Sequence, residues 1–427
     1  MLDRKLIREN PEFVRLQAAR KHISAPVEEF LEVDTRYRTN KAELDKANGE
    51  SNQIAKSIGA LMAQGKKDEA EQAKGQTTAL KAKVRELEER DRFMEAELRA
   101  VELRFPNLPH ATAPDCKDET ENVTCREWGT KAEASKPHWE IATELGIIDF
   151  DRASKISGTG FAVYVGQGAK LVRSLISFMA DLQVRDNGYT EVYPPCLISS
   201  QSLEGTGNLP KFADDLYKCE GDDLWLAPTA EVPVTNLLRD EILDASVLPV
   251  KLAAYTPCFR REAGSAGRET RGILRTHQFD KVELVKFVHP DTSYDELESL
   301  VTDAEDVLQA LGLAYRVLEL CTGDMGDKPC KIYDLEVWAP GVGSYLEVSS
   351  CSNFEAFQAR RSGIRYRKEQ GAPPEFVHIL NGSGLAFPRL FAALVESNYK
   401  EGVVTIPEAL RPYTGFESIS RQARALP

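Results

Sequence analysis

The segment between Arg260 and Lys281 concentrates charged groups that suit an anion-binding site. Its basic residues outnumber its acids in a chain whose net charge is -13. The flanking stretches 253–260 and 278–288 have strand composition, which predicts a long basic loop between two strands. Arginine guanidinium groups bind phosphate through paired hydrogen bonds, so a phosphate site is expected, and an exposed hairpin tip is the alternative. The charged residues are Arg260, Arg261, Arg268, Arg271, Arg275 and Lys281, against Glu262, Glu269 and Asp280.

Carboxylates, hydroxyls and a further arginine recur in three short motifs outside this loop. The sequence LAPTAE ends at Glu231, YLEVSS contains Glu347 and Ser350, and NGSGLAFPR ends at Arg389. The chain has no Walker A motif, no HExxH and no histidine at a spacing that would activate a nucleophile. This set suits phosphoryl or nucleotidyl transfer, in which positioning and charge neutralisation supply most of the catalysis.

Length and composition describe a globular protein with two domains. The 427 residues exceed one usual domain, and 42% hydrophobic with 28% charged residues suits a large core. No run approaches roughly 18 apolar residues, and the start, MLDRKLIREN, lacks a secretory signal, so neither a membrane span nor export is expected. The eight cysteines include no CxxC pair. Free thiols in a reducing compartment, and hence a cytoplasmic protein, are expected over disulfides or zinc.

The N-terminal quarter has the pattern of two long helices. Between residues 28 and 63, and again between 80 and 101, apolar residues recur at spacings of three and four, with a polar break at 64–67. A short turn between long helices predicts an antiparallel hairpin, roughly 50 Å long at ~1.5 Å per residue. From this pattern alone a dimerisation coiled coil is the default explanation, because the charges of the arm are balanced and mark no phosphate-binding face.

The remainder of the chain, after the prolines at 106, 109 and 114, mixes helix and strand signals. Helices are predicted over 169–186, 229–243, 293–311 and 385–396, and strands over 189–193, 224–227, 314–320, 332–338, 344–349 and 403–406. Helices do not alternate one for one with strands, which argues against a parallel βαβ array. The prediction is an α+β fold in which helices flank a mostly antiparallel sheet.

The stretch FRREAGSAGRETRGILRTHQFDKVE, residues 259–283, resembles motif 2 of class II aminoacyl-tRNA synthetases, specifically of the seryl-tRNA synthetase family. GYTEVYPP at 188–195 is similar to motif 1, which in that family builds the dimer interface. NGSGLAFPR is similar to motif 3, with Pro388 where the family often has glycine, so a shifted or shortened helix start is expected there. The resemblance covers nearly the whole chain. It implies the class II antiparallel sheet flanked by helices, preceded by an antiparallel α-helical coiled-coil arm.

The resemblance implies an ATP site. Arg260 would contact the α-phosphate, Glu262 the adenine edge, and Arg389 the γ-phosphate, which makes Arg260 and Arg389 the expected catalytic residues. Phe279 would stack on the adenine ring, although its spacing fits a core residue equally well. Arg275 would assist with the phosphates. The full set expected to bind ATP is Arg260, Arg261, Glu262, Arg275, Phe279, Glu347, Val348, Ser349, Ser350 and Arg389.

The same resemblance implies a metal and an amino-acid pocket. Glu347 and Ser350 would hold Mg²⁺ bridging the ATP phosphates, since oxygen ligands are what this ion prefers. A pocket of carboxylates and hydroxyls would pair the ammonium and hydroxyl of serine and reject alanine. The sequence leaves open which acid takes which group. The expected serine-binding residues are Thr229, Ala230, Glu231, Glu283 and Ser383.

The expected organisation is a helical coiled-coil tRNA-binding arm at 1–110 and a class II catalytic domain binding ATP and serine at 111–427. The expected function is a homodimeric serine–tRNA ligase, which charges tRNA(Ser) and, as the family also does, tRNA(Sec). The loop tip at 264–271 would approach the acceptor end of the tRNA. Two other functions are weighed: a paralogue that loads a carrier protein, which loss of the arm would favour, and a non-catalytic tRNA binder, which substituted motif residues would favour.

Overall fold

The computed structural model describes residues 1–263 and 271–421 of the 427. The chain divides into two compact units. One comprises Leu2–Ala19 and Ser24–Pro106; the other comprises Met1, Arg20–Ile23 and the chain from Asn107 onward. The tip of the predicted basic loop, Gly264–Arg271, lies outside the described residues except for Arg271.

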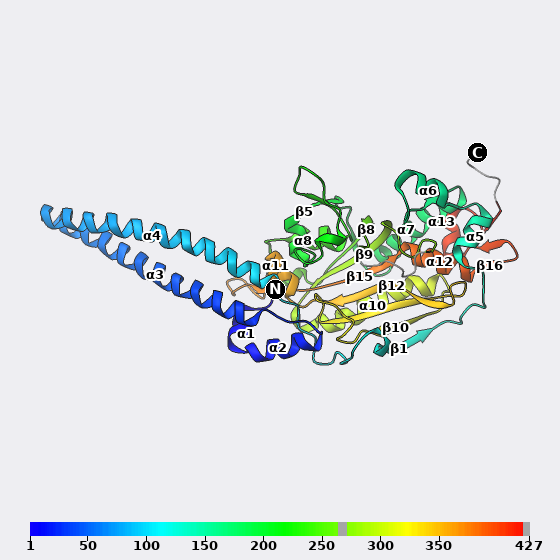
Figure 1. Cartoon of the computed structure of the whole chain (residues 1–427), viewed down its shortest axis with the longest axis horizontal. Helices are drawn as coiled ribbons and strands as arrows, with labels where there is room; N and C mark the ends of the chain where they lie inside the picture. Colours follow the sequence, from blue (N-terminus) through cyan, green and yellow to red (C-terminus); the bar gives the residue numbers. More distant parts are fainter. Residues whose placement is uncertain (264–270, 422–427) are drawn as a thin grey trace. The chain divides into compact units, whose positions relative to one another are not determined.

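The first unit is a helical hairpin with two short helices at its base (Figure 1). The short helices are α1 (Arg4–Glu9) and α2 (Pro11–Arg20), and the long pair is α3 (Val27–Ala63) and α4 (Lys67–Glu102). Leu44, Ala47 and Leu87 are buried in the seam between the long helices. The buried amide of Asn40 donates to the carbonyl oxygen of Leu87 at 3.2 Å, which fixes the register of the pair. The predicted antiparallel arm is confirmed.

The second unit is built on an eight-stranded sheet in the order β1-β10-β11-β12-β15-β9-β8-β4. All neighbouring pairs are antiparallel except β4 and β8, so the predicted mostly antiparallel sheet is confirmed. The strands are β1 (Val123–Trp128), β10 (Tyr315–Glu319), β11 (Lys331–Ala339), β12 (Ser344–Asn353), β15 (His378–Ala386), β9 (Gln278–Val288), β8 (Val250–Phe259) and β4 (Thr190–Glu191).

Three long helices pack against this sheet: α7 (Gln167–Arg185), α10 (Ser293–Ala310) and α12 (Phe387–Ser397) (Figure 1). Their apolar residues form one buried cluster with alternate residues of the strands, such as Val282 and Leu284 of β9. Val285 and Phe287 belong instead to a second cluster, which covers the other face. Because side chains alternate across a strand, residues 279, 281 and 283 of β9 share the face of this second cluster.

The smaller elements complete the unit. The helices are α5 (His138–Leu145), α6 (Phe150–Ser157), α8 (Ser200–Thr206), α9 (Glu231–Thr235), α11 (Phe357–Ser362) and α13 (Arg411–Thr414). The strands are β2 (Ile148–Asp149), β3 (Val163–Tyr164), β5 (Leu197–Ser199), β6 (Leu224–Leu226), β7 (Ile242–Asp244), β13 (Arg365–Arg367), β14 (Glu375–Phe376), β16 (Tyr399–Lys400), β17 (Val403–Thr405) and β18 (Ser418–Ser420). None of the described helices is long and apolar enough to cross a membrane.

Two predicted helix boundaries are wrong. The helix expected over 229–243 is limited to α9 and one 3-10 turn, Asn236–Leu238, because residues 242–244 pair in parallel with β13. The helix expected from 385 begins at Phe387, because β15 continues to Ala386 in its pairing with β9. Pro388 lies in the first turn of α12, where its missing N–H costs no helical hydrogen bond. The helix therefore accommodates this proline without loss of its first turn.

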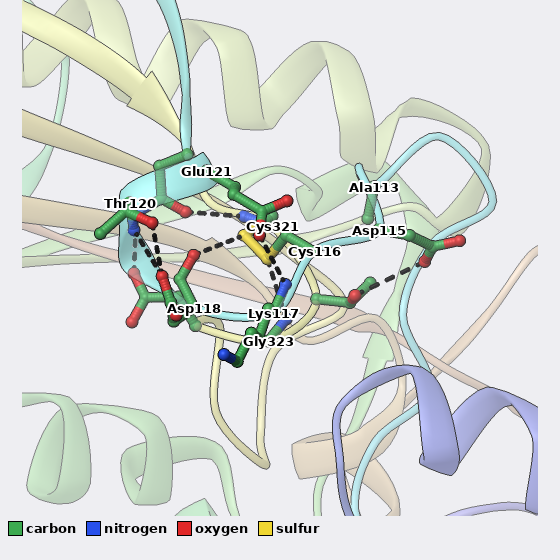
Figure 2. The surroundings of a disulfide bond; sticks show 12 residues. Ala113, Asp115, Cys116, Lys117, Asp118, Thr120, Glu121, Cys321 and Gly323 are labelled. Carbon is green, nitrogen blue, oxygen red and sulfur yellow. Dashed lines mark hydrogen bonds between the residues drawn. A yellow bond between two sulfur atoms is a disulfide. The ribbon is translucent and has the colours of Figure 1, made fainter.

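The expectation that all cysteines are free is wrong for one pair. Cys116 and Cys321 form a disulfide, with Cα atoms 5.6 Å apart (Figure 2). The segment that begins at Pro114 lies beside residues 321–323. The Thr322 N–H donates to the Pro114 carbonyl oxygen at 2.8 Å. This contact brings together two cysteines that are 205 residues apart in the sequence. No short sequence motif predicts a pair so far apart. The free cysteines are Cys125, Cys196, Cys219, Cys258, Cys330 and Cys351.

Candidate active site

Two cavities of about 420 and 200 Å³ lie where β8 and β9 meet the basic loop, defined as residues 260–277. Arg260, Glu262 and Arg275 line both cavities, so the two volumes adjoin. Arg260 directly follows β8, and its carbonyl oxygen lies 3.1 Å from Nδ1 of His277, just before β9. The strand pair therefore brings the two ends of the loop together, and the contact of His277 joins them.

The 200 Å³ cavity collects the arginines predicted to bind phosphate. Phe279, Glu347 and Arg389 line it together with Arg260 and Arg275. The Arg260 guanidinium carbon lies 5.1 Å from the centre of the Phe279 ring. Arg389 donates from Nη1 to the carbonyl oxygen of Glu347 at 2.9 Å and to its carboxylate at 3.1 Å. Three guanidinium groups beside an aromatic face suit a nucleotide with several phosphates.

A salt bridge joins the remaining predicted pair in this region. Nη1 of Arg275 lies 3.2 Å from the carboxylate of Glu262. Glu262 adopts a positive φ of 51°, which only a small share of non-glycine residues do. Such outliers cluster at ligand sites. We infer that the positive φ of Glu262 directs its carboxylate across the loop toward Arg275.

The 420 Å³ cavity holds two of the residues predicted to bind serine. Thr229 and Glu231 line it, and Glu283 lies directly behind Thr229, whose hydroxyl is 3.3 Å from the Glu283 carboxylate. Nζ of Lys281 donates to the Thr229 hydroxyl at 2.8 Å and lies 2.5 Å from the same carboxylate. Burial raises the pKa of Glu283, and Lys281 opposes that shift. The site thus holds a buried carboxylate whose charge is favoured first by Lys281 and further by Arg260.

Glu231 has partners that sequence reasoning did not include. Nε2 of Gln358 donates to its carboxylate at 2.7 Å, and Nζ of Lys328 lies 3.5 Å from the same oxygen. Lys328 and Asn208 also line the cavity. Both residues lie in loops, where no helix or strand periodicity predicts the direction of a side chain. Lys281 is different, because its alternation with Phe279 and Glu283 along β9 could have placed it at the site.

The residues predicted to hold Mg²⁺ lie on the face of the sheet that carries the arginines. Glu347 and Ser350 are on β12, and Asp334 of β11 pairs with Ser350 in the sheet register. Oδ1 of Asp334 is buried without a hydrogen-bond partner in the described structure. Burial, with repulsion from Glu347, raises the pKa of Asp334 well above its usual value. An oxygen set with one orphaned acceptor fits a divalent cation such as Mg²⁺.

The described residues contain no cluster of three or more His, Cys, Asp or Glu that could bind a metal by itself. Any cation at Glu347 and Ser350 would need further ligands from the phosphates. This is the usual arrangement for Mg²⁺, which keeps few protein ligands in nucleotide sites.

Some predicted residues do not present their side chains to either cavity. Val348 is buried in the core cluster, and Ala230 is buried in the second cluster. The Ser349 hydroxyl donates to the carbonyl oxygen of Ser383 at 2.6 Å, which ties β12 to β15. Arg261 is exposed and contributes its N–H to the carbonyl oxygen of Asp215 at 2.9 Å. Ser383 itself lines the 200 Å³ cavity, in which it lies beside Lys281.

An antiparallel sheet that presents motif arginines from a strand pair and from the start of α12 defines a class II aminoacyl-tRNA synthetase core. The family profile described as "tRNA synthetase class II core domain (G, H, P, S and T)" matches residues 216–398. The profile "Seryl-tRNA synthetase N-terminal domain" matches residues 1–109.

Full-length relatives identify the family within this class. The chain is 49% identical to a serine–tRNA ligase of Carboxydothermus hydrogenoformans, covering 99% of this chain and 100% of the relative. It is 52% identical to a serine–tRNA ligase of Thermomicrobium roseum, covering 99% and 95%. A crystal structure of seryl-tRNA synthetase from Pyrococcus horikoshii complexed with ATP superimposes with a TM-score of 0.89 at 35% identity, covering 99% and 100%. This chain belongs to the seryl-tRNA synthetase family.

Proposed function

We propose that this protein activates L-serine with ATP and transfers the serine to tRNA(Ser), as a serine–tRNA ligase. The observation that carries the proposal is the joined pair of cavities. One is lined by three arginines and Phe279, and the other by Thr229 and Glu231. A phosphate chain and an amino acid bound in adjoining cavities are placed for reaction with each other. The full-length similarity to serine–tRNA ligases supports the same substrates.

In the first step the serine carboxylate attacks the α-phosphate of ATP. A bond forms between the carboxylate oxygen and phosphorus, the bond to the β-phosphate oxygen breaks, and pyrophosphate leaves. In our proposal Arg260 neutralises the α-phosphate, Arg275 assists, and Arg389 binds the γ-phosphate. Phe279 stacks on the adenine, and Glu262 accepts from its amino edge. Arg261, Val348 and Ser349 contribute to this site through backbone groups.

Glu347 and Ser350 are the residues that would hold Mg²⁺, with Asp334 behind them. When bound, the ion supplies neutralising charge between the phosphates. Arg389 is bonded to Glu347. The same carboxylate therefore orients the γ-phosphate arginine and belongs to the proposed cation site.

Serine recognition is assigned to the larger cavity together with Ser383, which lines the smaller one. Glu231 and Glu283 supply the negative charge that pairs with the serine ammonium and hydroxyl, and Thr229, the backbone of Ala230 and Ser383 complete the pocket. A buried acceptor left unpaired costs about 1–3 kcal/mol. Alanine, which leaves the hydroxyl partner unpaired, is therefore rejected.

In the second step a ribose hydroxyl at the tRNA terminus attacks the acyl carbon, and AMP leaves. We assign residues 1–110 to binding of the tRNA body and 111–427 to catalysis, acting as a homodimer in the cytoplasm. tRNA(Sec) is a second acceptor to be included in the assay. The long antiparallel arm supports the first assignment, because a carrier-loading paralogue would have no use for it.

The test is pyrophosphate exchange with ATP and each of the twenty amino acids, followed by charging of tRNA(Ser) and tRNA(Sec). We expect exchange with serine alone and serine-dependent charging. Exchange without charging of either tRNA would indicate the carrier-loading paralogue. Absence of exchange would indicate a non-catalytic tRNA binder.

A further inference from the structure

A fully buried carboxylate lies at the last turn of α12. Both oxygens of Glu396 are engaged, and the side chain is 0% exposed. Oε1 accepts from the N–H of His138 and lies beside His138 Nδ1, each at 2.8 Å. Oε2 accepts from the N–H groups of Gly341 and Val342 at 2.8 and 3.1 Å. Four contacts compensate the burial of this charge, which would otherwise be costly.

The second ring nitrogen of His138 continues this chain of contacts into the basic loop. The N–H of Ile273 donates to His138 Nε2 at 3.2 Å. Since Nε2 accepts, the ring proton is on Nδ1 and is donated to Glu396. Next to Ile273, Gly272 has a φ of +73°, and a Cβ there would lie 2.2 Å from Nε2. Only glycine therefore permits the loop to approach the imidazole so closely.

Three of the segments joined in this way lead to the nucleotide cavity. Ile273 is two residues before Arg275, and Leu274 between them lines the cavity. The turn at Gly341 leads into β12, which carries Glu347. Glu396 lies in the last turn of α12, and Arg389 lies in its first turn. None of the residues in the buried pair lines either cavity.

We propose that His138 and Glu396 are positioning residues for ATP. They hold the C-terminal stem of the basic loop at a fixed distance from β12 and α12, so that Arg275, Glu347 and Arg389 converge. The proposal rests on the function proposed above. Because neither residue reaches the serine cavity, loss of the contact should weaken ATP use and leave the apparent affinity for serine largely intact.

Two substitutions separate the two bonds of the imidazole. His138→Asn retains a short donor for Glu396 and loses the acceptor for Ile273. His138→Gln places an amide oxygen at about the reach of Nε2 and restores that acceptor. We expect His138→Asn to raise KM for ATP about tenfold in pyrophosphate exchange, which corresponds to one lost hydrogen bond. KM for serine should change less than about twofold, and His138→Gln should recover most of the loss.

A readout independent of activity is amide hydrogen exchange of residues 271–276. The amide of Ile273 should exchange about tenfold faster in His138→Asn and near the wild-type rate in His138→Gln. Wild-type exchange of pyrophosphate with serine tests the proposed function, whereas the Ile273 amide tests the contact itself. The two failures can therefore be distinguished.

Gly272→Ala provides a second route if the histidine variants fold poorly. The added methyl group displaces the loop from His138 without removing a buried hydrogen-bonding group, and it should raise KM for ATP selectively. The proposal is overturned if the Asn and Gln variants behave alike. It is equally overturned if KM for ATP and serine rise together, or if the Ile273 amide is unchanged in every variant.

Discussion

At the scale of single residues, Lys281, which lines the 200 Å³ cavity, connects the Thr229 hydroxyl with the buried carboxylate of Glu283. Its ammonium group donates a hydrogen bond to the Thr229 hydroxyl and lies 2.5 Å from the Glu283 carboxylate. In Lys281→Met this buried carboxylate loses its counter-charge, which costs about 3–5 kcal/mol when the group stays ionised. We expect KM for serine to rise at least about tenfold.

The same variant should shift the pH profile of kcat/KM for serine in one predictable direction. Burial already raises the pKa of Glu283, and Lys281 lowers it. Removing Lys281 therefore raises this pKa further, and the acid limb of kcat/KM for serine should move to higher pH. An exposed lysine, Lys400, provides the control as Lys400→Met. Superimposable profiles for Lys281→Met and the wild type would exclude this role.

A second residue-scale prediction concerns Lys21, which donates to the carbonyl oxygen of Pro329 at 2.5 Å. Burial lowers the pKa of this lysine to about 7. Between pH 7 and about 10.5 the unfolded chain holds the proton that the folded chain has lost, so stability rises with pH, by up to about 1.4 kcal/mol per unit. Lys21→Met should remove this slope. Urea unfolding midpoints at pH 7, 8 and 9 measure it, and equal slopes in both proteins would contradict the prediction.

A third prediction concerns Arg389, which lies in the first turn of α12 and contacts Glu347. Arg389→Ala should lower pyrophosphate exchange by a factor on the order of 10²–10³, because a phosphate-neutralising group is lost. Glu347 is 44% exposed, so the fold should keep its melting temperature. Arg389→Lys is the matched control and should retain part of the activity through its point charge. Unchanged exchange in Arg389→Ala would refute the motif 3 assignment.

At the scale of elements, the arm and the sheet are stabilised in different ways. The arm depends on a narrow seam, in which Leu80 and Val84 pack beside the buried residues 44, 47 and 87. Beyond that seam, towards the turn, most of its side chains are exposed. Its outer half is therefore a separable structure, whereas the central strands of the sheet share a core with several helices.

Shortening the arm tests its function. Replacing residues 50–77 with a short Gly-Ser turn retains the seam at 44, 47, 80, 84 and 87. We expect serine-dependent pyrophosphate exchange within about twofold of the wild type and charging of tRNA(Ser) reduced at least about tenfold, because in our proposal the arm binds the tRNA body. Equal loss of both activities would contradict a separate tRNA-binding arm.

At the scale of the whole molecule, an exposed apolar segment supports the proposed dimer. Tyr193 is 83% exposed, and Val184 and Leu197 on either side of it are also exposed. The segment lies beside β4, the edge strand of the sheet. Exposed apolar residues beside a sheet edge suit a protein–protein interface.

The substitution Tyr193→Asp places a charge in this segment and should convert the protein to a monomer in light scattering coupled to size exclusion. Ile156→Asp is the matched control, because Ile156 is 75% exposed on α6, outside the segment. Burying an unpaired charge at an interface costs several kcal/mol, enough to change the dissociation constant by about a hundredfold or more. A Tyr193→Asp protein that remains a dimer would place the interface elsewhere.

Local patterns in the sequence were sufficient for elements whose hydrophobic period is long and regular. The seam of the arm and the alternation along β9 are examples, because each side chain's position follows from the helical or strand period. The prediction failed at 229–243, where parallel pairing of β7 with β13 overrides helix propensity. It also could not identify Lys328 or Asn208, which reach the cavity from loops.

The sequence by itself therefore determined the two-unit organisation, the α+β class and the motif residues, since these follow from local periodicity and ordered motifs. Only the tertiary structure decided which motif residues face a cavity and which, such as Val348, are buried in the core. It also decided the Cys116–Cys321 disulfide and the His138–Glu396 pair, whose members are 205 and 258 residues apart. Contacts across such separations depend on how the strands and helices pack, and no short segment of sequence encodes that packing.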